Sequence, residues 1–305
     1  MTATPPEPGD ATAQPARTAR GRLPVVRRDP VLLAVAHGTS HPPGIATLQA
    51  LLERVRELAP GLQAELAFVD HEPPSVRGAL RSFADRGAAV AALPLLLTAA
   101  SHSKGDIAGA VRIARDERPG FAVTYGRPLG PDPLLLAALS DRVTEAGAGP
   151  ETAIVLASAG AADPDANAEI WRAARLFWEF RRGGPPVEVA YASATTPTVT
   201  QTVDRLHRLG HDDVLVVPYF LAPGRLPGGV RRDALAAGAR AADVLGAHES
   251  VARLVLARYA EAVGDSVLMN CDTCQYRSPW PGRETRVGQI QQPHSHPADA
   301  PVSPG

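Results

Sequence analysis

The sequence predicts an α/β protein of two tandem, similar domains, each a mainly parallel sheet flanked by helices and related by internal duplication. Two observations indicate this fold class. Apolar runs of strand length alternate with amphipathic stretches of helix length, which is typical of βαβ units and of a parallel sheet covered on both faces. The same order of motifs then occurs a second time along the chain.

The expected elements of the first half follow one another from residue 31. Strand-like apolar runs cover residues 31–36, 64–69, 90–97 and 121–125. Amphipathic periodicity indicates helices at residues 45–58, 75–86 and 105–115. Since helices separate the strands, we expect the strands to run parallel, with their carboxyl ends at one edge of the sheet.

The second half repeats these motifs at a nearly constant offset. ELAFVDHEPPSV from residue 65 aligns without gaps with EVAYASATTPTV from residue 188, an offset of 188 − 65 = 123. LPLLL and VPYFL are 217 − 93 = 124 residues apart, and Leu129-Gly130 and Leu245-Gly246 are 116 apart. We therefore expect domains at residues 30–147 and 151–262. The Pro-rich tails, residues 1–29 and 263–305, are expected to be mostly disordered.

Composition excludes several classes of protein. Hydrophobic residues make up 45% and charged residues 21% of the chain, as in soluble globular proteins. A net charge of −1 lacks the basic surplus of a nucleic-acid-binding protein. No apolar run approaches the roughly 20 residues of a membrane span, and the N-terminus lacks the apolar core of a secretory signal. The two cysteines, Cys271 and Cys274, are too close together for a useful structural disulfide. We expect a cytoplasmic protein that binds neither nucleic acid nor membrane.

Three polar residues fall at strand ends in the first half. His37 ends the first strand in AHGTSHP, Asp70 ends the second in AFVDHEPP, and His102 follows the third in PLLLTAASHSKGDI. Ligands of open α/β sheets bind beyond the carboxyl ends of the strands. Two imidazoles and a carboxylate suit a first-row divalent ion. These residues therefore predict a metal site.

The second half lacks all three candidate ligands. The matching positions hold Ser158, Ser193 and Leu226. A duplicated scaffold that differs at these positions favours a functional role for the residues of the first half.

Each of these residues also has a structural interpretation. His37 is also consistent with a hydrogen-bonded loop residue, and His102 with a solvent-facing one. Asp70 is also consistent with a cap of the next helix. The neighbouring His41 and His71 are expected to assist the site or to be exposed.

The motifs AHGTSHP, FVDHEPPSV and PLLLTAASHSKGDI resemble those of the sirohydrochlorin chelatases, class II (ATP-independent) tetrapyrrole chelatases. The resemblance covers residues 31–140, and the second half looks like the degenerate domain of the long, two-domain form. It implies a metallochelatase of the lyase class that inserts Co²⁺ or Fe²⁺ into sirohydrochlorin, in cobalamin or siroheme biosynthesis. The macrocycle would lie in the cleft between the lobes.

The resemblance also implies roles for single residues. His37 and His102 would bind the metal and act in catalysis. The family commonly has a glutamate where this chain has Asp70, which is one methylene shorter, so His71 and Glu72 remain alternatives for the third ligand.

Metal insertion also requires proton removal from the pyrrole nitrogens. A neutral histidine can hold the ion or accept a proton, since its unperturbed pKa of about 6.5 lies near working pH. The sequence does not say which of the two histidines is the base. Cationic neighbours would suit a macrocycle rich in carboxylates. Lys104, Arg127 and Arg225 are candidates by position, although ordinary solvated charges are the simpler interpretation.

Cys271 and Cys274 lie in the motif MNCDTC after the second domain. The motif is similar to the M-x-C-x-x-C of long sirohydrochlorin chelatases, where it is associated with an iron–sulfur cluster. Two cysteines per chain imply a homodimer, or non-cysteine ligands, for a four-thiolate cluster. His294 and His296 resemble a remnant of a His-rich tail, with a disordered polar tail as the alternative.

Two other functions compete with the enzyme. A metal-binding or delivery protein on a chelatase scaffold would bind metal without tetrapyrrole turnover. A redox sensor would use Cys271 and Cys274. The intact pair of histidine motifs favours the chelatase.

Overall fold

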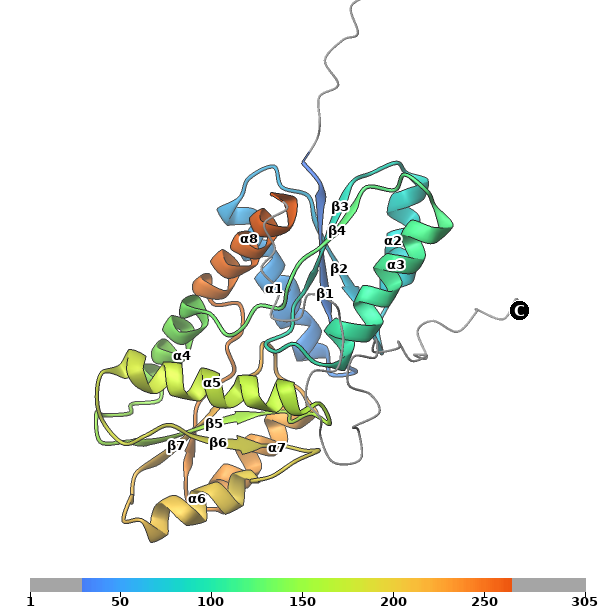
Figure 1. Cartoon of the computed structure of the whole chain (residues 1–305). Helices are drawn as coiled ribbons and strands as arrows, with labels where there is room; N and C mark the ends of the chain where they lie inside the picture. The colour runs from blue at the N-terminus through green and yellow to red at the C-terminus, as the bar shows by residue number, and fades with distance from the viewer. Residues whose placement is uncertain (1–28, 265–305) are drawn as a thin grey trace, which may run out of the picture.

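The computed structural model describes residues 29–264 as two α/β lobes, each built on a four-stranded parallel sheet (Figure 1). The first sheet has the order β2-β1-β3-β4 and the second the order β6-β5-β7-β8. The strands of the first sheet are β1 (Val31–Ala36), β2 (Ala64–Phe68), β3 (Val90–Pro94) and β4 (Val123–Tyr125). Those of the second are β5 (Ala153–Ser158), β6 (Glu188–Tyr191), β7 (Val214–Pro218) and β8 (Arg240–Ala241). The predicted fold class is confirmed.

Helices connect the strands in both lobes. They are α1 (Pro42–Leu58), α2 (Val76–Asp85), the π-helical segment η1 (His102–Ile107), α3 (Ala108–Glu117), α4 (Pro133–Glu145), α5 (Pro164–Arg181), α6 (Val199–Arg208), α7 (Arg225–Ala236) and α8 (Glu249–Val263). Helix α1 begins three residues earlier than predicted, because Pro42 and Pro43 fit a first helical turn. The third strand ends at Pro94 rather than at residue 97. Pro94 pairs with Val35, and this is the last paired position between β3 and β1.

The central strands are buried on both faces. All six residues of β1 and all six of β5 are buried, as their continuous apolar runs indicate for strands covered by helices on each side. Polar residues that end such strands are therefore placed at the edge of the sheet.

The backbone confirms the duplication and corrects one predicted correspondence. The N–H of Asp70 donates to the carbonyl of His37, and the N–H of Ser193 donates to the carbonyl of Ala159. The counterpart of His37 is therefore Ala159, not Ser158 as the sequence alignment predicted. The connection between the first two strands is one residue longer in the second lobe, since 193 − 159 = 34 whereas 70 − 37 = 33, and the gap-free alignment of the second strands does not reveal this difference. Ala159 is no metal ligand either, so the contrast between the lobes stands.

The third strands preserve the predicted correspondence. β3 begins at Val90 and β7 at Val214, an offset of 214 − 90 = 124. At this offset, Leu226 of α7 is the residue of the second lobe that corresponds to His102 of η1. An apolar side chain in the second lobe thus occupies the position of a candidate ligand.

The last helix of each half packs on the opposite lobe. α8 lies against α1, β3 and β4, whereas α4 lies against α5 and β7 (Figure 1). The division at residues 30–147 and 151–262 stays a prediction, and in space the two lobes exchange these helices. A single hydrophobic cluster that includes Leu32, Phe177 and Leu254 spans both lobes.

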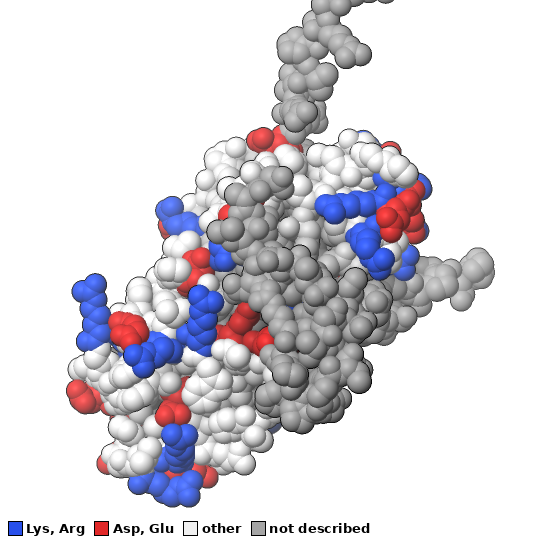
Figure 2. Space-filling model, viewed as in Figure 1, with Lys and Arg blue, Asp and Glu red and all other residues white. Residues whose placement is uncertain are grey.

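Charges of both signs are mixed on the face shown in Figure 2. A cluster lies over α2 and α3, where Glu117 pairs with Arg77 and Arg81. This mixing agrees with the net charge of −1. Among residues 29–264, none of the helices combines the length and apolar character needed to cross a membrane.

Candidate metal-binding site

The loop after β1 is pressed against the loop after β2. Gly38 has a φ of 96°, and a Cβ atom there would lie 1.8 Å from the carbonyl oxygen of Asp70, so the position requires glycine. The N–H of Asp70 donates to the carbonyl of His37 over 2.8 Å. These contacts fix the backbone of His37 at the carboxyl edge of the sheet.

The fold brings His37 and His102 together. Their ring centroids are 4.5 Å apart, with planes tilted by 55°. His71, which has a left-handed φ of 69°, stacks on the same His37 ring at a centroid distance of 6.2 Å. Three imidazoles from the ends of β1, β2 and β3 therefore form a cluster.

The carboxylate of Asp70 turns toward its own loop. Its Oδ1 accepts from the N–H of His71 over 2.8 Å, and its Oδ2 lies 3.6 Å from Nε2 of that ring. Ser75, not Asp70, caps α2 by accepting from the N–H of Gly78. Across the described residues 29–264, no group of three or more His, Cys, Asp and Glu side chains is arranged to hold a metal ion. The structure thus assembles the histidine pair, whereas the third ligand stays a prediction among Asp70, His71 and Glu72.

His41 is placed by the start of helix α1. It is the exposed N-cap residue of α1, and its N–H donates to Oγ1 of Thr39. Its side chain makes no capping hydrogen bond.

Asp106 orients the ring of His102. The two residues lie four apart in η1, and Nδ1 of His102 lies 2.7 Å from Oδ2 of the buried carboxylate. A carboxylate at Nδ1 favours the tautomer that carries its proton there, so Nε2 is the nitrogen suited to a metal ion. Sequence reasoning missed Asp106. The signal available was an acidic residue four positions after a candidate ligand in a predicted helical stretch.

The environment of His37 favours its neutral form. Partial desolvation lowers the pKa of His37, and the nearby His102 lowers it further. Opposing contributions from a backbone hydrogen bond and from Asp70 do not reverse this shift. A neutral imidazole is the form that binds a metal ion or accepts a proton.

Two of the predicted cationic neighbours are held in ion pairs. Nζ of Lys104 lies 2.7 Å from Oδ2 of Asp163, and both side chains are only 4% exposed. Arg127 donates from Nε and Nη2 to the two carboxylate oxygens of Glu261. Arg225 is exposed at the start of α7. The interpretation as a solvated charge is therefore wrong for Lys104, because the second lobe supplies a buried carboxylate.

Removing the charge of Asp106 should weaken metal binding. We expect Asp106→Asn to lower the affinity for Co²⁺ by about 10- to 100-fold, because an amide no longer favours the required tautomer of His102. Titration followed by the visible absorbance of cobalt measures the change. Asp116→Asn, on α3 beyond η1, is the control and should bind as the unmodified protein does. Equal affinities in the two variants would refute an orienting role.

Four predicted residues lie outside the described residues 29–264. These are Cys271, Cys274, His294 and His296.

The fold and the site define a class of α/β protein with two duplicated lobes, in which one lobe carries a histidine pair at the carboxyl edge of its sheet. Comparison with known proteins identifies the family. The CbiX family model matches residues 31–146 and 153–262, and the chain belongs to this family.

Relatives of known name span most of the chain. The sirohydrochlorin cobaltochelatase of Priestia megaterium is 31% identical over 264 residues, which cover 81% of this chain and 84% of the relative. The sirohydrochlorin ferrochelatase of Bacillus subtilis (strain 168) is 26% identical, over 77% of this chain and 92% of the relative.

Solved structures share the fold. SirB from Bacillus subtilis with Fe³⁺ superposes with a TM-score of 0.67 at 24% identity, over 78% of this chain and 97% of that structure. The sirohydrochlorin chelatase SirB from Bacillus subtilis subspecies spizizenii in complex with cobalt gives a TM-score of 0.64 at 24% identity, with the same coverage of 78% and 97%. The predicted family and its two-lobed architecture are confirmed.

Proposed function

We propose that this protein inserts a divalent metal ion, Co²⁺ or Fe²⁺, into sirohydrochlorin, as a chelatase of cobalamin or siroheme biosynthesis. The observation that carries the proposal is the 4.5 Å approach of the His37 and His102 rings. They meet at the ligand-binding edge of the sheet, in a chain that is 31% identical to a sirohydrochlorin cobaltochelatase.

The two histidines hold the metal ion, and one of them can also accept a proton during insertion. His102, oriented by Asp106, presents Nε2 to the metal ion. His37, whose lowered pKa keeps it neutral, holds the ion with His102 or accepts a pyrrole proton. An incomplete protein shell lets the ion leave for the ring nitrogens, because open coordination positions admit the incoming ligand.

Asp70 is proposed as the third ligand, as the sequence predicts. Its side chain is 17% exposed and lies in the loop that contacts the backbone of His37. His71 and Glu72 share this loop and remain the alternatives. Cobalt titration of Asp70→Asn, His71→Gln and Glu72→Gln separates them, since the largest loss of affinity identifies the ligand.

Turnover with the tetrapyrrole tests the proposed function. Purified protein is incubated with sirohydrochlorin and Co²⁺, Fe²⁺ or Ni²⁺, and the change in absorbance is followed. A chelatase accelerates metal insertion over many turnovers. The competing metal-delivery function predicts stoichiometric metal binding with insertion no faster than in buffer, and this result would overturn the proposal.

We also propose that Cys271 and Cys274 hold an iron–sulfur cluster shared by two chains in the reducing cytoplasm. The support is the M-x-C-x-x-C motif together with the count of two cysteines per chain. Iron–sulfur clusters usually have four thiolate ligands, and one chain supplies two. A homodimer supplies all four, and the alternative is a cluster that takes its remaining ligands from other residue types.

A cysteine variant tests the cluster separately from the chelatase site. We expect the double variant Cys271→Ser, Cys274→Ser to lose any brown iron–sulfur absorbance while keeping substantial metal insertion. The absorbance spectrum and the sedimentation of both proteins, purified without oxygen, provide the measurement. An unchanged brown spectrum in the double variant would disprove cysteine ligation.

A further inference from the structure

The turn that carries His102 is tied to the second lobe by a buried cation. Lys104 of η1 is 4% exposed, and its Nζ lies 2.7 Å from Oδ2 of Asp163 and 3.7 Å from Oδ2 of Asp165. Both acids stand at the N-terminus of α5. Because a buried ammonium is strongly unfavourable without partners, this ion pair holds η1 against α5.

A second contact holds the chain just before this turn. Oε2 of Glu169 in α5 accepts from the N–H of Ala99 over 2.8 Å. Ala99 is three residues before His102, and Lys104 is two residues after it. The same helix of the second lobe therefore holds the metal-binding turn on both sides of its histidine.

The duplication shows that this contact is specific to the second lobe. Asp163 is the N-cap of α5, and its counterpart is His41, the N-cap of α1, at an offset of 163 − 41 = 122. The first lobe makes the related contact by backbone packing, since a Cβ on Gly44 would lie 2.6 Å from the carbonyl oxygen of Pro223. The two lobes thus contact each other through equivalent loops, but within residues 29–264 only the loop of the second lobe brings a buried acidic side chain, Asp163, to the turn that carries a candidate histidine ligand.

We infer that the second lobe, which lacks the metal ligands, positions His102 of the first lobe through Asp163 and Glu169. The inference rests on the proposed function for its catalytic consequence. His102 must stay beside His37 while the metal leaves, and a displacement of about 1 Å at a reacting centre can lower a rate by about 10²-fold. Asp163 and Glu169 are positioning residues, because they act through the turn.

The chain offers a closely matched control for Asp163. Asp132 is likewise a helix N-cap, and its Oδ1 accepts from the N–H of Leu134 as Oδ1 of Asp163 accepts from the N–H of Asp165. Asp132 also pairs with a buried cation, Arg258, over 2.8 Å. Asparagine retains helix capping at both sites and removes only the charge.

The experiment compares Asp163→Asn with Asp132→Asn in the full chain. Co²⁺ binding without tetrapyrrole is followed by absorbance, and insertion is measured as kcat and as KM for sirohydrochlorin. We expect Asp163→Asn to bind Co²⁺ about tenfold more weakly and to lower kcat, with KM for sirohydrochlorin unchanged. Asp132→Asn should lower the melting temperature and leave Co²⁺ affinity intact. Asp163→Glu, which restores the charge, should recover part of the affinity.

The outcomes separate the inference from the proposed function. Equal Co²⁺ affinity and kcat in Asp163→Asn and Asp132→Asn would overturn the positioning role while leaving the chelatase intact. Absence of insertion by the unmodified protein, with weakened Co²⁺ binding in Asp163→Asn, would overturn the chelatase and support the positioning role. If Asp163→Asn does not fold, Glu169→Ala replaces it, with weaker Co²⁺ binding again expected and unchanged binding contradicting the inference.

Discussion

Alanine in place of His37 or His102 should lower the turnover of metal insertion by about 10²-fold or more, the range typical of a lost acid–base or ligand group. Each substitution removes one imidazole of a pair whose centroids are 4.5 Å apart, so a single ligand nitrogen of the pair remains. The affinity for Co²⁺ should fall together with kcat, because in the proposed site the two imidazoles hold the ion that insertion consumes. Absorbance assays with Co²⁺ and sirohydrochlorin measure turnover, and cobalt titration measures binding.

His41→Ala provides the control for these two variants. His41 follows His37 by four residues in the same loop, and its exposed side chain makes no capping hydrogen bond. Its removal should leave turnover and Co²⁺ affinity unchanged. Turnover retained in His37→Ala and His102→Ala would contradict the assignment of the site.

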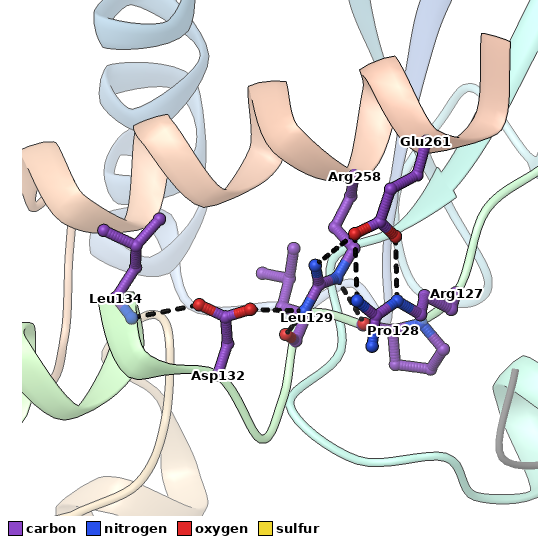
Figure 3. A network of polar contacts seen from close by, with 7 residues as sticks. All are labelled: Arg127, Pro128, Leu129, Asp132, Leu134, Arg258 and Glu261. Carbon is purple, nitrogen blue, oxygen red and sulfur yellow. Dashed lines mark hydrogen bonds and ion pairs between the residues drawn. The ribbon is translucent and has the colours of Figure 1, made fainter. Parts of the chain in front are cut away.

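Replacing Arg258 by methionine should lower the free energy of unfolding by about 3–5 kcal/mol, as expected when one partner of a buried ion pair is lost. Arg258 is 2% exposed and donates to the carbonyls of Pro128 and Leu129 and to the carboxylates of Asp132 and Glu261 (Figure 3). Methionine fills part of the volume but leaves these acceptors without the guanidinium. Urea denaturation followed by circular dichroism measures the loss.

Arg253→Met tests whether burial of the arginine causes the expected loss of stability in Arg258→Met. Arg253 lies on the same helix α8, but it is 57% exposed and pairs with Glu249 at the surface. Loss of this pair should change stability by at most about 0.5 kcal/mol. Similar effects of the two substitutions would show that the Arg258 network does not stabilise the contact between α8 and the segment before α4.

Much of this fold follows from local patterns. The apolar run at residues 31–36 is β1 within its predicted bounds, and the repeated motifs predict the second sheet. The sequence predicts the positions of His37 and His102, because parallel strands present their carboxyl ends at one edge and a polar residue after each buried run lies there. The counterpart of His37 is Ala159 rather than the predicted Ser158, because backbone hydrogen bonds between the strand ends set this pairing and the motif letters do not show them.

The sequence by itself determined the α/β class, the duplication and the placement of His37 and His102 at the edge of the first sheet. Each of these depends on the periodicity or the motifs of a short segment. The tertiary structure alone decided the exchange of α4 and α8 between the lobes, the ion pair of Lys104 with Asp163 and the burial of Arg258. Lys104 and Asp163 are 59 residues apart, and Arg258 and Asp132 are 126 apart. No local pattern encodes such pairs, since a buried ion pair forms only where the folded lobes bring opposite charges together out of water.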